Sequence, residues 1–530
     1  MTSPKHQQFH IRKDFGTIEV MQWLNTIVDE LMARQPEGEI LIESGASPSG
    51  TYHLGHMREL LTPDAVLLEL RRRGRQARHI HFVDDLDALR KIPVNIPADY
   101  EKYLGMPLCD IPAPDDSDRS YGNFFLDGFK ASGEMLGIEV DYIYAHDKYR
   151  AGEMVPAIER SLERIPQARR ALETVSGRQL DEHWSPIQVM EQGRLKNRRF
   201  VSLNKAEKTL VYADAEGAEK TIRYDDGQVK LDWRLDWPGR WWLLSVTAEP
   251  FGRDHASAGG SYDTGVQIMK DVYEAPAPYP IPYDFINMAG DTKKMSASKG
   301  TGLDAVEGAT IMPAEVVRYF ILGAAPNKRL YFDPVGGVVK LMDEYAALAA
   351  KPDKTADEEQ LLYICTRGGE ARTVSRVPFS HLVASYQASL RDPARTLEVI
   401  KRTEHSQAAE EDAEIITREL TFIDAWLDKR APDEVKFSLR EQIEKGEFSE
   451  TQVKLFSGLA EKVAAAPADA DGEYFHLALY SFKEELGMQP KEMFSALYRL
   501  LIGKPSGPRA GYFLSILPRD WLLSRLRLER

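Results

Sequence analysis

The chain is poor in cysteine and lacks any long run of apolar residues. Only Cys109 and Cys365 occur among its 530 residues, too few for a disulfide framework or a four-cysteine metal site. No stretch reaches the roughly eighteen apolar residues that a membrane span needs, and the N-terminal residues have no apolar core of the kind a secretory signal carries. We therefore expect a globular protein of the reducing cytoplasm with no membrane partner.

Positive charge is also scarce, because 68 lysines and arginines face 82 aspartates and glutamates and the formal net charge is -14. Such a balance argues against a nucleic-acid partner only as a whole-chain average. Two local basic patches stand out, one at residues 71–75 and one in the tail after Arg499. Each patch is as consistent with an ordinary solvent-exposed face as with a surface that binds RNA. Composition neither supports nor excludes RNA binding.

The length allows about two to four domains, and the first of them begins with a strand–helix–strand pattern. An apolar run predicts a buried strand over Glu39–Glu43, and an amphipathic helix follows from about Leu54 to Arg73. A second strand is predicted at Ala77–Val83. Polar loops at the carboxyl ends of such strands are typical of a Rossmann-like, doubly wound parallel sheet. The predicted fold class is α/β.

The stretch between the first strand and its helix, Glu43–Glu59, reads ESGASPSGTYHLGHMRE. His53 and His56 lie three residues apart at the start of the helix, where free backbone N–H groups and the helix dipole can hold a phosphate. Two imidazoles there suit negative charge that develops on an α-phosphate during attack. Taken alone, the pair is also consistent with metal ligands or with an ordinary helix start.

A second stretch, Asp291–Gly302, reads DTKKMSASKGTG. Its lysines, serines and glycines suit a mobile loop that closes over a triphosphate. HxGH after the first strand, combined with a later KMSxS, is the paired signature of the class I aminoacyl-tRNA synthetases. The chain resembles that superfamily.

Acidic residues follow the second strand, where Asp84–Pro93 reads DDLDALRKIP. Three carboxylates so close together fit a metal cluster. They fit better as acids that cap the strand end and pair with Arg90 and Lys91, which is the interpretation we favour.

The pattern along the chain predicts three parts. Residues 1–300 form the catalytic domain, with a small α/β module inserted at about 90–230 in which short antiparallel strands are predicted. Residues 301–355 form a connector after the KMSAS loop, and the resemblance implies that it contacts the tRNA stem. Beyond a polar boundary at 351–359 only helical periodicity occurs, so residues 356–530 form an all-α domain, anticodon-binding by resemblance. The expected module strands are 199–203, 209–213 and 220–224, and the expected C-terminal helices are 382–390, 412–427, 435–445, 450–464, 474–486 and 491–501.

A tryptophan-rich run, Leu231–Leu244, reads LDWRLDWPGRWWLL and interleaves charges that an apolar core disfavours. The run is followed by EPFGRDHASAGGSYD, by PIPYDFINMAG before the KMSAS loop, and by a closing GPRAGYFLSILPRDW. In these stretches, from about Glu39 to the end, the chain resembles the class I type of lysyl-tRNA synthetase.

That resemblance implies a ligase that activates lysine with ATP to lysyl-adenylate and transfers it to the 3′-terminal adenosine of tRNA(Lys). It assigns roles to three sets of residues. The catalytic set is His53, His56, Lys294, Ser296 and Lys299. The ATP-binding set is Pro48, Gly50, His53, Gly55, His56, Met295 and Ser298. The lysine-binding set is Gly45, Ser47, Trp233 and His255, with Asp236, Glu249 and Asp254 as acids to test for the ammonium.

The expected partners are L-lysine, ATP with Mg²⁺, and tRNA(Lys). The resemblance also suggests that tRNA has to be present before the adenylate forms. We expect a monomer. Three departures from the family pattern matter. Ala297 replaces a usual serine, His56 stands where the family often has asparagine, and residues 184–230 contain none of the cysteines that often ligate metal there. We therefore predict no protein-bound metal and no structural zinc.

Three alternatives stay open. A small-substrate nucleotidyltransferase also uses an HxGH turn, but such enzymes are usually shorter and need no helical C-terminal third. A catalytically silent tRNA-binding paralogue is disfavoured by the intact His53, His56, Lys294 and Lys299. A class I synthetase for another amino acid, such as glutamate, is disfavoured because acids and tryptophan suit a cation better than a carboxylate.

Overall fold

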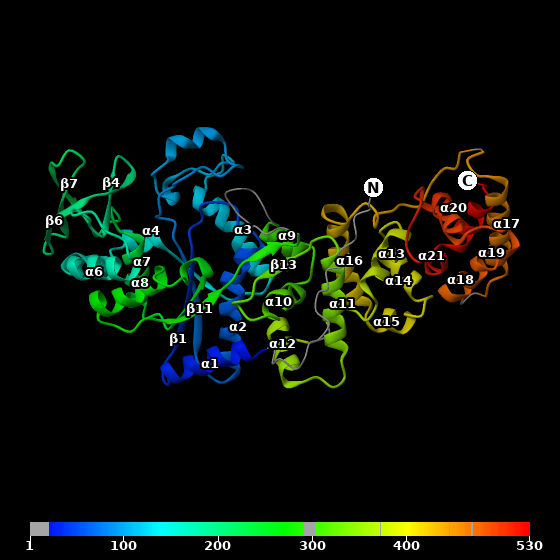
Figure 1. Ribbon diagram of the computed structural model, residues 1–530, viewed down its shortest axis with the longest axis horizontal. Helices are drawn as coiled ribbons and strands as arrows, with labels where there is room; N and C mark the ends of the chain where they lie inside the picture. The colour runs from blue at the N-terminus through cyan, green and yellow to red at the C-terminus, as the bar shows by residue number, and fades with distance from the viewer. Residues whose placement is uncertain (1–20, 291–302, 371–372, 445, 468–469, 530) are drawn as a thin grey trace, which may run out of the picture.

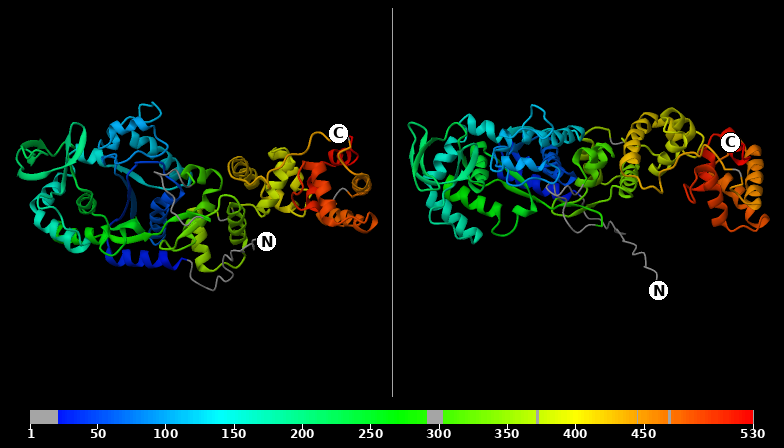
Figure 2. Two further views of the ribbon diagram at one scale, coloured as in Figure 1. Left: turned by 45° about the horizontal axis from the view of Figure 1, so that its top comes forward. Right: turned by 90° about the horizontal axis from the view of Figure 1, so that it is seen from above.

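The computed structural model of the protein describes residues 21–290, 303–370, 373–444, 446–467 and 470–529. The molecule is elongated, with small β-sheets at one end, a parallel sheet next to them, and helices that extend to the C-terminus at the other end (Figures 1 and 2). No helix in these described ranges combines the length and apolar character needed to cross a bilayer.

The central sheet is parallel and has the strand order β11-β10-β1-β2-β3. From the central strand β1 the chain first adds strands on one side and then returns to add strands on the other. The order therefore reverses between β1 and β10, which is the place where ligands bind in open α/β sheets. The predicted doubly wound α/β fold is confirmed. The strands are β1 (Ile40–Ala46), β2 (Ala77–Val83), β3 (Asp141–Tyr144), β10 (Ala248–Gly252) and β11 (Tyr279–Tyr283).

Both faces of this sheet are covered, as the alternation of strand side chains requires. Ile40 and Ile42 point into one core, which contains α1 (Gln22–Arg34), α2 (Arg58–Arg72) and α3 (Tyr121–Met135). Leu41 points into the other, which packs against a second set of helices. That set consists of α4 (Ala145–Arg150), α5 (Val155–Glu163), α6 (Ile165–Ser176), α7 (Trp233–Leu244) and α8 (Ser261–Ile268).

Element boundaries near the first turn differ from the predictions. β1 continues to Ala46, three residues beyond the expected end, so Ser44 and Gly45 belong to the strand. A 3₁₀ turn, η1 (Leu54–Met57), precedes α2, which begins only at Arg58. Residues 155–176 form two helices, α5 and α6, because Pro166 near the start of the second cannot continue the hydrogen bonding of the first.

The inserted module contains two small antiparallel sheets, with the orders β5-β4-β9 and β6-β7-β8. The three strands expected there are present with shifts of at most one residue at their ends. The strands are β4 (Ile187–Glu191), β5 (Arg194–Asn197), β6 (Arg199–Asn204), β7 (Thr209–Ala213), β8 (Glu219–Arg223) and β9 (Val229–Leu231).

After β12 (Ile286–Met288), the regular elements of the described chain are helices, apart from β13 (Leu330–Phe332), which pairs with β12 in parallel. These helices form two bodies. The first shares the core of α1–α3, and the last six helices build a second core that also includes Ala384, Ala388 and Val399 of the first body. The first comprises α9 (Ala305–Thr310), α10 (Ala314–Leu322), α11 (Gly337–Ala350), α12 (Ala356–Thr366), α13 (Phe379–Ala388), α14 (Pro393–Ile400), α15 (Ser406–Glu411) and α16 (Ala413–Lys429). The second comprises α17 (Glu450–Ala465), α18 (Gly472–Tyr480), α19 (Phe482–Glu485), α20 (Pro490–Ile502), α21 (Ala510–Ile516) and α22 (Arg519–Leu526).

One predicted helix is wrong: residues 435–444 contain no helix. Two backbone N–H groups of this segment donate to distant acceptors instead of to the preceding turn. Phe437 donates to the side chain of Gln387 at 2.8 Å and Arg440 to the carbonyl of Leu501 at 2.8 Å. Tertiary hydrogen bonds therefore override an amphipathic pattern in the link between the two helical bodies.

The boundary predicted at 351–359 falls between α11 and α12. However, α12 packs back toward the sheet domain, because Arg318 Nε donates to the carbonyl of Ile364 at 3.0 Å and Asn25 hydrogen bonds to Gln360 at 3.1 Å. The domain limits stay a prediction.

A buried polar cluster lies where β1 and β2 meet the helices of the first core. Ser44 Oγ is 2.9 Å from His79 Nε2 and 2.9 Å from His81 Nδ1, and all three side chains are buried. Burial lowers the pKa of His79 from its ordinary value of 6.5 to about 4. The unfolded chain therefore binds more protons than the folded chain between these two pH values.

It follows that the free energy of unfolding decreases as pH falls below 6.5. Between pH 7 and 4.5, His79 should account for about 2–3 kcal/mol of that decrease. Urea unfolding of the parent and of His79→Asn, which does not titrate, measures this difference. Identical pH dependence in the two proteins would contradict the assignment.

Candidate functional site

A cavity of about 400 Å³ opens where the strand order reverses, outside the carboxyl ends of β1 and β10. Its lining comes from the ends of these strands, the turn around η1, one side of α7, the residues after β2, and the segment 283–286. Of the expected residues, it brings together Gly45, Ser47, His53, Gly55, His56, Trp233, Glu249, Asp254 and His255. It adds several that sequence reasoning missed, among them Glu59, Asp84, Asp87, Trp237 and Arg240.

The turn before α2 holds its two histidines side by side, with ring centroids 3.8 Å apart. The backbone N–H of His53 donates to Nδ1 of His56 at 3.0 Å, so in the neutral His56 ring the proton is on Nε2. Gly55 is required between them, because a Cβ there would lie 2.9 Å from Nδ1 of His53. Two imidazoles are thus presented together to the cavity.

This turn is joined to the residues that follow the KMSAS stretch. Leu54 N–H donates to the carbonyl of Leu303 at 2.8 Å, and Ala305 N–H donates to the carbonyl of Tyr52 at 3.2 Å. Asp304 between them forms a β-bridge with His53. The five candidates on the stretch itself lie outside the described residues: Lys294, Met295, Ser296, Ser298 and Lys299.

Arg240 links α7 to both strands at the floor of the cavity. Its Nη1 donates to Asp84 Oδ1 at 2.6 Å, and its Nε lies 2.7 Å from Glu43 Oε1. All three side chains are almost fully buried. Burial raises the pKa of Glu43 to about 8 and that of Asp84 to about 6, although Arg240 opposes both shifts.

Glu249 and Glu59 add two more buried carboxyl groups. Trp237 Nε1 donates to Glu249 Oε1 at 2.8 Å, while Oε2 of Glu249 is buried and has no hydrogen-bond partner among the described residues. Glu59 Oε1 accepts from the backbone N–H of Gly45 at 3.1 Å. Burial raises the pKa of Glu249 well above its usual range and that of Glu59 to about 8. One buried arginine does not neutralise so many acids, and a cation in the cavity would stabilise their ionised forms.

Aromatic rings form the opposite side of the cavity. Trp233 and Trp237 stack with centroids 5.5 Å apart, and the His255 ring lies 5.4 Å from the first and 5.6 Å from the second. His255 and Asp254 belong to a short 3₁₀ turn, η4 (Arg253–His255), directly after β10. The aromatic surface suits an aliphatic or cationic ligand.

Asp236 is placed differently from the expectation, because it does not line the cavity. Its carboxylate is fully buried and accepts hydrogen bonds from Lys230 Nζ at 2.7 Å and from the Tyr149 hydroxyl at 3.0 Å. Lys230 Nζ also lies 3.2 Å from a carboxylate oxygen of Asp87. Burial disfavours the charged form of Lys230, but these carboxylates raise its pKa well above its ordinary value. Asp236 therefore supports the cavity from beneath.

Pro48 and Gly50 lie in the loop between β1 and η1 and are not among the lining residues. Pro48 instead faces α3, where a Cβ on Gly122 would be 3.4 Å from its Cγ.

The acids after β2 also have partners other than those expected. Asp84 pairs with Arg240, Asp85 with His146, and Asp87 with Lys230. We had expected Arg90 and Lys91, which are neighbours in sequence. The only hint of these ion pairs in the sequence is the set of charges within the tryptophan-rich run, since Arg240 and Asp236 both belong to that run.

Replacing Asp236 tests whether it is a structural residue. Asp236→Asn should lower the free energy of unfolding by about 3 kcal/mol, because it leaves the buried Lys230 undercompensated. Asp254→Asn, at an exposed position, should leave stability unchanged. Urea unfolding of both variants decides, and equal stabilities would contradict this placement of Asp236.

Comparison with known proteins identifies the family. Residues 21–365 match the family model described as tRNA synthetases class I (K). A Lysine--tRNA ligase of Archaeoglobus fulgidus is 35% identical over 96% of this chain and 99% of its own, and one of Pyrococcus horikoshii is 32% identical over 96% and 100%. The solved structure of a glutamate tRNA ligase from Elizabethkingia meningosepticum has a TM-score of 0.40 at 13% identity, with 93% of this chain and 99% of that chain covered. The chain belongs to the family of class I tRNA synthetases designated K.

Proposed function

We propose that this protein is a lysine–tRNA ligase, an enzyme that activates L-lysine with ATP and transfers it to the 3′-terminal adenosine of tRNA(Lys). The observation that carries the proposal is the cavity, which has carboxyl groups at its floor, tryptophans at one side and two histidines at its mouth. Full-length relatives that are lysine–tRNA ligases support it.

The cavity fits lysine better than an acidic amino acid. The aliphatic stem packs along Trp233 and Trp237, and the ammonium approaches Glu249, whose Oε2 has no hydrogen-bond partner among the described residues. Asp254 and His255 close the far side, and Gly45 and Ser47 leave space for the reacting carboxylate. A glutamate side chain would bring a further negative charge to carboxyl groups that burial already disfavours in their ionised form.

ATP binds on the other side of the cavity, with its phosphates at His53 and His56. A lysine carboxylate oxygen attacks the α-phosphorus, the bond to the β-phosphate oxygen breaks, and pyrophosphate leaves. Hydrogen bonds from the two imidazoles stabilise the charge that builds up on the α-phosphate. The remaining catalytic and ATP-binding assignments form part of the proposal: Pro48, Gly50, Gly55, Lys294, Met295, Ser296, Ser298 and Lys299.

Mg²⁺ enters with ATP and prefers oxygen donors, which the carboxyl groups around the cavity offer. In the second step a hydroxyl of the terminal adenosine attacks the lysyl carbonyl carbon, and AMP leaves. Positioning supplies most of the catalysis in both steps.

The tRNA is read away from the cavity. We assign the anticodon to the helices after residue 356 and the stem to residues 301–355, within a cytoplasmic monomer whose catalytic part is residues 1–300 with the module at 90–230. The elongated arrangement, which separates the last helices from the sheet (Figure 2), supports a division between acceptor end and anticodon. Stacking and phosphate contacts would supply recognition there.

Amino-acid-dependent exchange between ATP and pyrophosphate tests the function. Exchange with lysine alone among the twenty amino acids is expected, measured with and without total tRNA. Exchange with glutamate or another amino acid instead would overturn the substrate, and no exchange under either condition would leave a silent tRNA-binding paralogue.

Removing one imidazole tests the phosphate role. His56→Ala should reduce the rate of lysine-dependent exchange by about 10²–10³. The variant should stay folded, because the lost acceptor for the His53 backbone N–H costs only about 1 kcal/mol. His183→Ala, at an exposed position in the inserted module, is the matched control and should keep the parent rate. A His56→Ala rate equal to that of the parent would exclude the role.

Truncating the aromatic side tests lysine binding. Trp233→Ala should raise the KM for lysine by about tenfold or more and leave the KM for ATP unchanged, because the stem loses its packing surface and the ammonium a nearby ring. Trp233→Phe should retain much of the affinity. Equal increases in both KM values would contradict a lysine-specific contact.

A further inference from the structure

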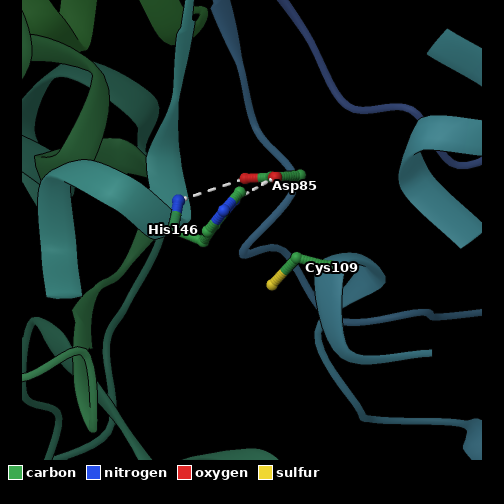
Figure 3. A group of neighbouring side chains, drawn as sticks. All are labelled: Asp85, Cys109 and His146. Carbon is green, nitrogen blue, oxygen red and sulfur yellow. Dashed lines mark hydrogen bonds and ion pairs between the residues drawn. The ribbon is translucent and has the colours of Figure 1, made fainter. Parts of the chain in front are cut away.

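Three side chains of different chemistry meet just beyond the end of β2 (Figure 3). Asp85 follows β2, Cys109 lies in the short turn η3 (Leu108–Asp110), and His146 is the second residue of α4. One oxygen, one sulfur and one nitrogen atom of these residues all lie within 4.8 Å of one another. Such a mixture of carboxylate, thiolate and imidazole donors is typical of zinc sites.

Backbone hydrogen bonds hold the three segments of this cluster together, so the cluster does not depend on the conformation of long side chains. Cys109 N–H donates to the carbonyl of Asp85 at 2.9 Å, and the neighbouring Leu108 N–H donates to the carbonyl of Asp87 at 3.0 Å. The backbone N–H of His146 donates to Asp85 Oδ1 at 3.1 Å. Asp85 is thus the common anchor of both other ligand segments.

The surrounding groups orient the ligands. His146 Nε2 lies 3.1 Å from Asp147 Oδ1, which favours the proton on Nε2 and directs Nδ1 to the Asp85 carboxylate (Figure 3). A carboxylate behind a metal-binding histidine is the usual second partner of such a ligand. Burial and the nearby Asp85 and Asp110 raise the pKa of the Cys109 thiol, and the Arg150 guanidinium, 3.8 Å from Cys109 Sγ, opposes them only in part, so the metal itself must displace the thiol proton.

We propose that Asp85, Cys109 and His146 bind one Zn²⁺ ion, with a water molecule in the fourth position. Tetrahedral zinc spaces its ligand atoms by about 3.3–3.8 Å. The most distant pair in the cluster must therefore approach by about 1 Å, and His146 Nδ1 and Asp85 Oδ2, which are in hydrogen-bond contact, must move apart by about 1 Å. The ion replaces the proton shared by Asp85 and His146 and the thiol proton of Cys109, and both protons are released.

The role of the ion is structural. It ties the irregular segment around Cys109 and the start of α4 to the end of β2, one residue from Asp84 at the cavity floor. We had expected no metal because residues 184–230 contain no cysteine, but this site uses a cysteine outside that range.

The test measures metal in the full-length protein. Protein stripped with a chelator and then exposed to Zn²⁺ should retain one equivalent after desalting, and Co²⁺ in its place should give a thiolate-to-cobalt absorption band. Cys109→Ser should lose the band, and both Cys109→Ser and His146→Ala should lose the bound equivalent. Cys365→Ser, which removes the other cysteine, should keep both.

A graded variant separates ligation from folding. Asp147→Asn leaves all three ligands in place and should weaken zinc affinity by about 10–100-fold, while circular dichroism confirms that every variant is folded. The proposal is overturned if the parent retains no stoichiometric zinc, if its cobalt form lacks the thiolate band, or if folded Cys109→Ser binds as tightly as the parent.

Discussion

The contact on which the site depends is that of Arg240 with Glu43 and Asp84. These residues come from α7, β1 and the end of β2, and their side chains are almost completely buried. Removing an arginine from such a group leaves uncompensated charge in a medium of low dielectric constant, so the three elements are held in one arrangement. The same contact turns α7 so that Trp233 and Trp237 face the cavity and Asp236 faces away from it.

The position of the cavity follows from topology, and its chemistry follows from burial. Parallel strands that diverge from β1 leave a crevice at their carboxyl ends, and the loops after β1 and β10 supply its lining. Carboxyl groups that lose water there are held above their ordinary pKa, so the cavity favours a cationic ligand. In the proposed function, selection of lysine and support of the fold draw on one set of buried charges.

The sequence predicted the parallel sheet, because periodicity encodes it, and the resemblance supplied nine of the residues that line the cavity. It did not predict which acids pair with which bases. Asp84 lies 156 positions from Arg240, and Lys230 with Asp236 is recognisable as a buried pair only once the strand and helix are packed. The helix predicted at 435–444 is absent for a related reason, since hydrogen bonds to distant acceptors outweigh the helical pattern of the sequence. Asp85, Cys109 and His146 likewise come together only in space.

The central claim is that the carboxyl groups of the cavity recognise the ammonium of lysine. Calorimetric titration of the full-length protein with L-lysine and with L-norleucine, which has the same stem without the ammonium, measures this directly, with and without tRNA. The account predicts that lysine binds at least about a hundredfold more tightly, because norleucine leaves buried carboxyl groups unpaired. Equal affinities for the two amino acids would contradict it.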